Sequence, residues 1–378
     1  MYYKIPTRLN SRFQYLPRLN NNMQRSFWNS SISALLTVLL LTMVVAGCTD
    51  GKDLPPSALI ILTGPKAGKP AGSICALDSS TGNILKETLL PGGRAKVLAR
   101  DPLGRYWVGY SARSGPSDHR LLLFSANLKL QKTITVGCND PGVGIVFSRG
   151  KVFAGCTENG RTGKIVVLDQ KTLSELAIIP LEAAAKASIY YLTALAASGD
   201  RLIVAGMTEG PDLSKRYTVV SVIDPATNRL TWQSKPLAGV DVWQIIPYRE
   251  KFILLNVASA EKRDKSSADI LLLHTDNRLE RRSMFPAPLW GTVQGDTLFA
   301  FHNASHNARS SDPKRFISSF DLQSGAQSSW PLPDGFNASG LLQQEGMLLL
   351  PGKTGQPWVH RFTPADGKFS VMTPPRDK

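Results

Sequence analysis

The stretch VVSVIDPATNRLTW, residues 219–232, decides the fold because its pattern recurs along the chain. It reads as an apolar strand, then Asp224 at the first turn position, then Asn228, then a second strand. Asp, Ser or Thr at that position accepts a hydrogen bond from the backbone two residues on, and Gly or Asn supplies the positive φ that closes the turn. We therefore predict a β-hairpin at each copy. The other copies are SICALDSSTGNIL (73–85), RLLLFSANLKL (120–130), KIVVLDQKTLSEL (164–176), DILLLHTDNRLE (269–280), FISSFDLQSGAQ (316–327) and WVHRFTPADGKF (358–369).

A second motif alternates with the first and consists of a turn followed by a short apolar run. Another apolar strand precedes most copies, for example at 95–100 and 242–248. One repeat is therefore about 42–55 residues long, with four short strands and no convincing helix. The copies are SALIILTG (57–64), GRYWVGY (104–110), GKVFAGC (150–156), DRLIVAGM (200–207), EKFILLN (250–256), DTLFAFH (296–302) and GMLLLPG (346–352).

Seven copies of each motif predict an all-β chain that forms a β-propeller of seven blades with about four strands each. Little sequence precedes the first copy of the second motif. Either the first blade has three strands, or residues 50–56 supply its fourth. Six or eight blades are alternatives, and so is a β-sandwich, although a sandwich would not repeat at this period.

The hairpins ALDSSTGNIL (76–85) and VIDPATNRLTW (222–232) resemble those of the bacterial YVTN-repeat and quinoprotein-like propeller families. The resemblance spans residues 57–373 and consists of turn chemistry, so it implies an architecture rather than an activity. The Trp-Asp dipeptide of WD40 blades is absent, and the tryptophan-docking repeats of quinoprotein dehydrogenases are not kept regularly. A quinone is therefore not supported, and we predict no cofactor.

The N-terminal region predicts export. Residues 1–47 hold five basic and no acidic residues, and Ala34–Ala46 is an apolar run of 13 residues. That run is shorter than the ~20 residues that cross a bilayer as a helix, and it fits the core of a secretory signal. Val45-Ala46-Gly47-Cys48 resembles the lipobox of bacterial lipoproteins, which implies lipidation of Cys48 and removal of the signal. An ordinary cleaved signal and an uncleaved anchor helix are the alternatives.

This interpretation divides the chain into a signal peptide (1–47), a tether (48–56), a propeller (57–373) and a tail (374–378). Translation from Met23 would give a signal of more usual length. The resemblance implies an extracytoplasmic protein held to a bacterial membrane by the lipid on Cys48. Thr49 in place of Asp implies the periplasmic side of the outer membrane, if the cell has one.

The net charge is +15 for the whole chain and +10 without residues 1–47. Such a charge favours anionic partners such as lipid headgroups or acidic polymers of the cell envelope. The export signal argues against nucleic acid, and the basic residues are spread along the chain rather than gathered in one arm. We expect a protein or an anionic envelope polymer as the partner.

Cys138 and Cys156 lie 18 residues apart, each near the end of an apolar segment. In an oxidising compartment they would close a disulfide loop that contributes about 3 kcal/mol. Two buried free thiols are the alternative. Cys75 reads as a small core residue of a strand. The chain has no C-x-x-C pair, which excludes a zinc ribbon.

The connections between the second and third strands of the blades are polar and predicted to be long. In a propeller they share a face with the connections between blades, so this face is the predicted binding surface. The connections are 111–119, 157–163, 207–216, 259–269 and 303–314, and the candidate ligand-face residues are His119, Trp243, Trp290, His302 and His306.

Each of these residues also has a structural interpretation. Trp243 and Trp290 would stack on a ligand at the mouth of the axis, or else pack in the core. His302 and His306 have an H-x3-H spacing that suits zinc only on a helix, and no third ligand can be named. Surface histidines are the alternative, and we assign no metal.

The sequence favours a non-catalytic binding or scaffolding protein. We assign no catalytic residue, because carboxylates and histidines do not repeat at equivalent blade positions and no G-x-S-x-G motif occurs. The first alternative is a propeller hydrolase, lactonase or lyase acting on sugars. The second is a metal-binding propeller that uses His302 and His306.

Overall fold

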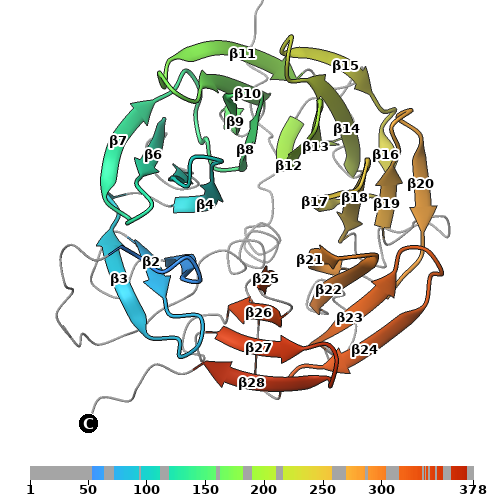
Figure 1. Cartoon of the computed structure of the whole chain (residues 1–378). Coiled ribbons are helices and arrows are strands. Elements are labelled where there is room, and N and C mark those ends of the chain that lie inside the picture. Colours follow the sequence, from blue (N-terminus) through green and yellow to red (C-terminus); the bar gives the residue numbers. More distant parts are fainter. Residues whose placement is uncertain are drawn as a thin grey trace, which may run out of the picture.

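The computed structural model of the chain is a ring of seven β-sheets arranged as blades around one axis (Figure 1). It describes residues 53–63, 72–92, 95–110, 119–158, 162–181, 190–209, 216–257, 270–285, 288–303, 315–333, 336, 338, 341–344, 347–351 and 359–372. The prediction of an all-β, seven-bladed propeller is confirmed. Within these ranges, no helix is long and apolar enough to cross a membrane.

The first four blades follow the chain order from the axis outward. Blade 1 is β1 (Leu59–Thr63), β2 (Ser73–Leu77) and β3 (Ile84–Leu89); blade 2 is β4 (Ala95–Arg100), β5 (Tyr106–Tyr110), β6 (Arg120–Phe124) and β7 (Leu130–Thr135); blade 3 is β8 (Gly144–Ser148), β9 (Lys151–Glu158), β10 (Thr162–Asp169) and β11 (Glu175–Leu181); blade 4 is β12 (Tyr190–Ser198), β13 (Arg201–Glu209), β14 (Arg216–Asp224) and β15 (Arg229–Gln233), with β16 (Leu237–Ala238) also paired to β14.

The last three blades have four strands each, in the same order. Blade 5 is β17 (Val242–Tyr248), β18 (Lys251–Asn256), β19 (Ile270–Leu273) and β20 (Leu279–Arg282); blade 6 is β21 (Pro288–Gln294), β22 (Thr297–Asn303), β23 (Arg315–Asp321) and β24 (Gln327–Pro331); blade 7 is β25 (Leu342–Gln344), β26 (Met347–Pro351), β27 (Val359–Thr363) and β28 (Lys368–Met372).

Apolar cores lie between neighbouring blades, because alternate side chains of a strand point to opposite faces of its sheet. Ile203 and Val220 of blade 4, for example, share one cluster with Phe252 and Leu271 of blade 5, and all four are buried. The second and third strands of a blade are covered on both faces. β5 and β19 are therefore continuous apolar runs rather than alternating ones.

The predicted turn chemistry is confirmed at the four hairpins that have an aspartate at the first turn position. Oδ1 of Asp78 accepts hydrogen bonds from the backbone N–H groups of Ser80 and Thr81, both at 2.8 Å. Asp169, Asp224 and Asp321 accept the same type of bond from residues two positions on. Positive φ is supplied by Gly or Asn in five of these hairpins, at Gly82, Asn228, Asn277, Gly325 and Gly367, and by leucine in the other two, at Leu128 and Leu173.

Blade 1 has three strands, so the first of the two predictions for that blade holds among the described residues, which begin at Asp53. The ring closes where blade 7 packs on blade 1. Cys75 and Leu77 of blade 1 share an apolar cluster with Leu349 and Met372 of blade 7. Within the described residues, the ring is therefore closed by core packing between the first and last blades, and the two blades share no strand.

Candidate binding face

Connections emerge on two opposite faces of the ring, because successive strands of a blade are antiparallel. In blades 2 to 7, the turns that join first to second and third to fourth strands are short; residues 249–250, for example, join β17 to β18. The second-to-third-strand connections and those between blades emerge on the other face, which we call the long-loop face. Most of the predicted ligand loops, His306 included, lie outside the described residues, at 111–118, 159–161, 210–215, 258–269 and 304–314.

One predicted long connection is only three residues long. β9 continues to Glu158, β10 begins at Thr162, and these two residues pair across the ladder. The prediction of a long loop at 157–163 was therefore wrong. Thr157 pairs with Gly163, so the polar residues extend the two strands rather than leaving them. β-Branched threonine suits a strand as well as a loop, and its polarity alone was misleading.

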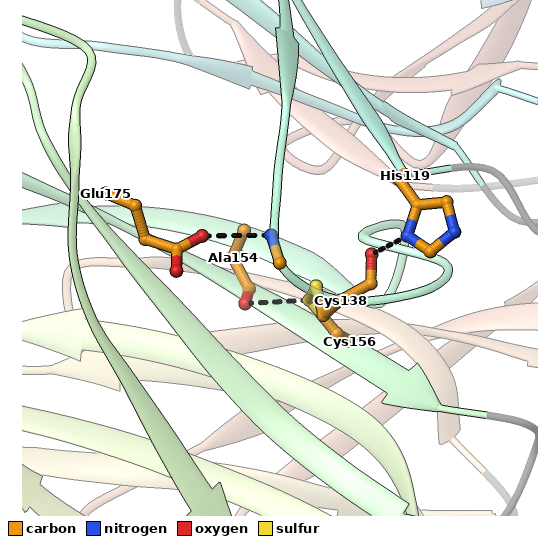
Figure 2. Close-up of a disulfide and its surroundings, with 6 residues drawn as sticks. His119, Cys138, Ala154, Cys156 and Glu175 are labelled. Carbon is orange, nitrogen blue, oxygen red and sulfur yellow. Dashed lines mark hydrogen bonds between the residues drawn. A yellow bond between two sulfur atoms is a disulfide. The ribbon is translucent and has the colours of Figure 1, made fainter.

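A disulfide joins Cys138 to Cys156 on the long-loop face, with the sulfur atoms 2.05 Å apart (Figure 2). Cys138 lies in the connection 136–143 between blades 2 and 3, whereas Cys156 lies on β9. Both side chains are buried. Beside them, the backbone N–H of Gly137 donates to Glu175 of β11 at 2.9 Å. The connection between the two blades is thus attached to blade 3 at two points.

His119 lies next to the same connection. Its Nδ1 is 2.9 Å from the carbonyl oxygen of Cys138, which fixes one side of the ring (Figure 2). The residue is exposed and directly precedes β6. The structure therefore places it on the long-loop face, beside the disulfide.

His302 lies beneath the long-loop face rather than on it. The residue is only 2% exposed, and its Nε2 is 2.7 Å from the hydroxyl of Ser318. The imidazole stacks on the Phe316 ring at 4.4 Å between centroids and meets Phe285 edge-on. These contacts make His302 a buried residue of β22 whose side chain packs against residues of β23. Its predicted partner His306 is outside the described residues.

Trp243 and Trp290 are half-buried on the inner strands of blades 5 and 6, near the long-loop face. Both pack against the apolar cluster between blades 6 and 7. The indole N–H of Trp243 donates to Asp241 at 2.8 Å, whereas the buried indole N–H of Trp290 has no partner in the part of the chain that the structure describes. The structure thus brings the two tryptophans to one cluster and leaves part of each indole accessible.

The inner strands of blades 2 to 7 contain no Asp, Glu or His within their described residues. Four of them, β4, β12, β17 and β21, share a β-bulge near their long-loop end. A bulge re-aims side chains locally and often accompanies a functional site. Lys96, Thr193 and Trp243 occupy three of the bulges. In the described part of the chain, no three His, Cys, Asp or Glu residues are placed to hold a metal ion.

A set of basic residues on the opposite face links neighbouring blades, and the sequence interpretation missed it. The cation at the start of a second strand reaches the outer hairpin turn of the next blade. Nη2 of Arg105 donates to the carbonyl of Gln170, and Nη2 of Arg201 donates to Oδ1 of Asn277, both at 2.8 Å. Lys151 donates to the turn at 225–228 in the same way. The cation that recurs in GRYW, GKVF and DRLI was the available signal.

Arg105 is held in place by a buried carboxylate. Its Nε donates to Oδ2 of Asp101 at 2.7 Å, and the indole N–H of Trp107 donates to the same oxygen at 3.0 Å. Burial acts to raise the pKa of Asp101, but the hydrogen bonds from Trp107 and Arg105 outweigh it, so the pKa lies below its usual value. Part of the basic charge of this chain therefore has a structural role.

Solved structures with the same fold include proteins of different activity. No protein-family model matches the chain, and no curated protein matches it in sequence. The chain resembles an oligogalacturonate lyase in complex with manganese, at 16% identity and a TM-score of 0.53 over 81% of this chain and 85% of that one.

Two further structures match over similar lengths. A 6-phosphogluconolactonase-like protein from Bacteroides uniformis shares 14% identity at a TM-score of 0.55, over 83% of this chain and 95% of that one. A hydrazine synthase from Kuenenia stuttgartiensis shares 12% identity at 0.53, over 88% and 100% of the two chains. Identities this low establish the propeller fold alone.

Proposed function

We propose that this protein is an extracytoplasmic lipoprotein whose propeller binds a protein or an anionic envelope polymer without catalysing a reaction. Lipid on Cys48 would anchor it to a bacterial membrane, on the periplasmic side of the outer membrane if the cell has one. The apolar run before Cys48 and the absence of acidic residues from 1–47 support this reading. The first strand begins at Leu59, so a short tether would keep the ring close to the bilayer.

The residue content of the inner strands is the observation that carries the non-catalytic part of the proposal. General acid–base catalysis needs carboxylates, histidines or similar groups converging on a substrate. The described inner strands of blades 2 to 7 instead offer Trp, Leu, Val, Thr and Lys side chains near the long-loop face. Apolar and aromatic surface with a few polar groups suits binding.

A sugar-acting enzyme is the second candidate, because a lyase and a lactonase-like protein share this fold. Fold likeness at this level does not separate it from the first candidate. A metal-binding role would require His302 to leave its contact with Ser318 and to become accessible. It is therefore the least supported of the three.

Two experiments test the proposal. Membrane fractionation of the wild type and of Cys48→Ala should show the wild type in the membrane fraction at mature length. The variant should be soluble or unprocessed. A Cys48→Ala protein that stays in the membrane at mature length would overturn the lipid anchor.

Crosslinking in intact cells followed by affinity capture tests the binding role. We expect repeated recovery of the same envelope protein or polymer with the wild type. Recovery of no partner, together with turnover in a screen of oligosaccharides and lactones, would favour the enzyme instead.

A further inference from the structure

Four buried nitrogen atoms near the seam between blades 6 and 7 have no hydrogen-bond partner among the described residues. They are Nε1 of Trp290, Nε of Arg315, and both Nδ1 and Nε2 of His360. Buried polar atoms are satisfied in the great majority of cases, and an unsatisfied one costs about 1–3 kcal/mol. A concentration of such atoms in one part of a fold therefore needs an explanation.

Phe336, in the connection between blades 6 and 7, contacts both His360 and Arg315. Its ring centroid is 3.8 Å from that of His360, and its carbonyl oxygen accepts a bond from Nη1 of Arg315 at 3.3 Å. Trp290 packs against the apolar cluster to which Phe336 belongs. We call Trp290, Arg315, Phe336 and His360 the seam site.

The seam site belongs to the long-loop face. Trp290 is near the start of inner strand β21, and Arg315 begins β23. His360 is the second residue of β27, and all three strands start on that face. Figure 1 shows blades 6 and 7 side by side, with the inner strands β21 and β25 next to the axis. The four side chains thus lie where the second-to-third-strand connections emerge.

Arg315 is one of three arginines of the described ranges that have a buried side-chain nitrogen without a hydrogen-bond partner, and Arg201 and Arg361 are the others. Arg105, Arg249 and Arg282 each form an ion pair with a carboxylate. Arg315 has no carboxylate partner in the part of the chain that the structure describes, and its one side-chain bond, to a backbone carbonyl, is long. A guanidinium with a buried, unpaired N–H is matched well by an anion.

His360 adds donor and acceptor capacity to the same place. The residue is 4% exposed, and burial lowers the pKa of its imidazole, so the ring is neutral at pH 7. A neutral imidazole offers one N–H donor and one acceptor nitrogen. Together with the indole N–H of Trp290, the seam site therefore presents several donors beside two aromatic rings.

We propose that the seam site binds a carboxylate-bearing sugar unit of an acidic envelope polysaccharide. The guanidinium of Arg315 and the indole N–H of Trp290 would donate to the carboxylate and neighbouring oxygens. His360 would accept from or donate to a hydroxyl. The half-buried ring of Trp290 supplies flat apolar surface for the sugar ring. This inference rests on the proposed binding function and specifies the ligand class.

The test uses the mature full-length protein and a short oligomannuronate, with its methyl ester as the uncharged match. Isothermal titration should show binding of the acid form and at least about tenfold weaker binding of the ester, since esterification removes the charge-assisted bond. Arg315→Gln should weaken binding of the acid form by about tenfold. Trp290→Phe, which keeps the ring and removes the N–H, should weaken it by about three- to tenfold.

The matched control is Arg229→Gln, which removes an exposed positive charge on β15 of blade 4 and should leave the affinity unchanged. Thermal unfolding of each variant verifies that the ring is intact.

Wild-type affinity in both folded seam variants, or equal binding of acid and ester, would overturn the seam site while leaving the binding function intact. Binding of a peptide with a free carboxyl terminus in place of the saccharide would overturn the ligand class. If the wild type binds neither probe, the seam site is wrong, and crosslinking then decides the binding function separately.

Discussion

Nζ of Lys151 lies 3.0 Å from Oδ1 of Asn228, across the seam between blades 3 and 4. The same ammonium donates to the carbonyl oxygens of Pro225 and Ala226 at 2.9 and 3.0 Å. All three N–H donors of the Lys151 ammonium therefore bond to one outer hairpin turn of blade 4. Lys151→Met keeps the aliphatic stem and removes the donors, so we expect a loss of about 1–2 kcal/mol in the free energy of unfolding, measured by urea denaturation.

Lys171→Met is the matched control for that substitution. Lys171 is exposed in the outer turn of blade 3, and its replacement should change the unfolding free energy by less than about 0.5 kcal/mol. Equal midpoints for Lys151→Met and the wild type would show that the links between blades add nothing to stability.

The parts of the fold that sequence could predict are the local ones. The hydrogen bonds to Asp78 and the positive φ of Asn228 act within their own hairpins, so the turn chemistry and its period were readable from a few neighbouring residues. Leu128 and Leu173 adopt positive φ without a residue type that favours it, and nothing local predicts that. The links between blades join residues 65 to 77 positions apart, so only the ring geometry brings them together.

The seam site was harder to predict from the sequence than the turns, because its residues also come together only in the folded ring. Trp290 was selected from its place before an apolar strand. Arg315 and His360 were not, since neither belongs to a motif that implies binding. The unpaired state of their nitrogens depends on packing between blades 6 and 7. His302 was expected near the surface, but alternation along β22 turns its ring toward Ser318 and Phe316.

Removal of the Cys138–Cys156 disulfide should destabilise the ring without unfolding it. The bond closes a loop with a sequence separation of 18, which corresponds to about 3 kcal/mol in the chain-entropy model. We expect Cys138→Ala/Cys156→Ala to lower the thermal midpoint, and reducing agent to lower the midpoint of the wild type but not of the variant. Cys75→Ala, at a buried cysteine outside this disulfide, should leave the effect of reductant in place.

The capped hairpins should make stability fall at low pH. Hydrogen bonds from Ser80 and Thr81 lower the pKa of Asp78 from 3.8 to about 2, and the pKa values of Asp169, Asp224 and Asp321 are also lowered. A carboxylate whose pKa is lower in the folded state contributes its full stability above the unfolded pKa and loses it as the pH falls through the folded pKa. The loss at Asp78 therefore falls between about pH 4 and pH 2.

Asp78→Asn isolates this effect, because the amide still accepts a backbone bond but does not titrate. The difference in urea midpoint between wild type and variant should be largest near pH 5 and should shrink toward pH 2. Thr363 occupies the equivalent position in blade 7, so Thr363→Ala should give a difference that does not depend on pH. A wild-type to Asp78→Asn difference that is constant from pH 5 to pH 2 would contradict the assignment.

Gly109 should tolerate no side chain, because the connection that carries Cys138 presses on it. A Cβ added at Gly109 would lie 2.1 Å from the carbonyl oxygen of Pro141, and a backbone atom cannot move aside as a side-chain tip can. We expect Gly109→Ala to cost about 1–3 kcal/mol or more, seen as a lower midpoint in thermal and urea unfolding. Gly92→Ala is the control, since no atom of the described residues lies within 4 Å of its added Cβ, and it should be neutral or slightly stabilising. Similar midpoints for the two variants would mean that the connection between blades 2 and 3 does not pack on β5 as described.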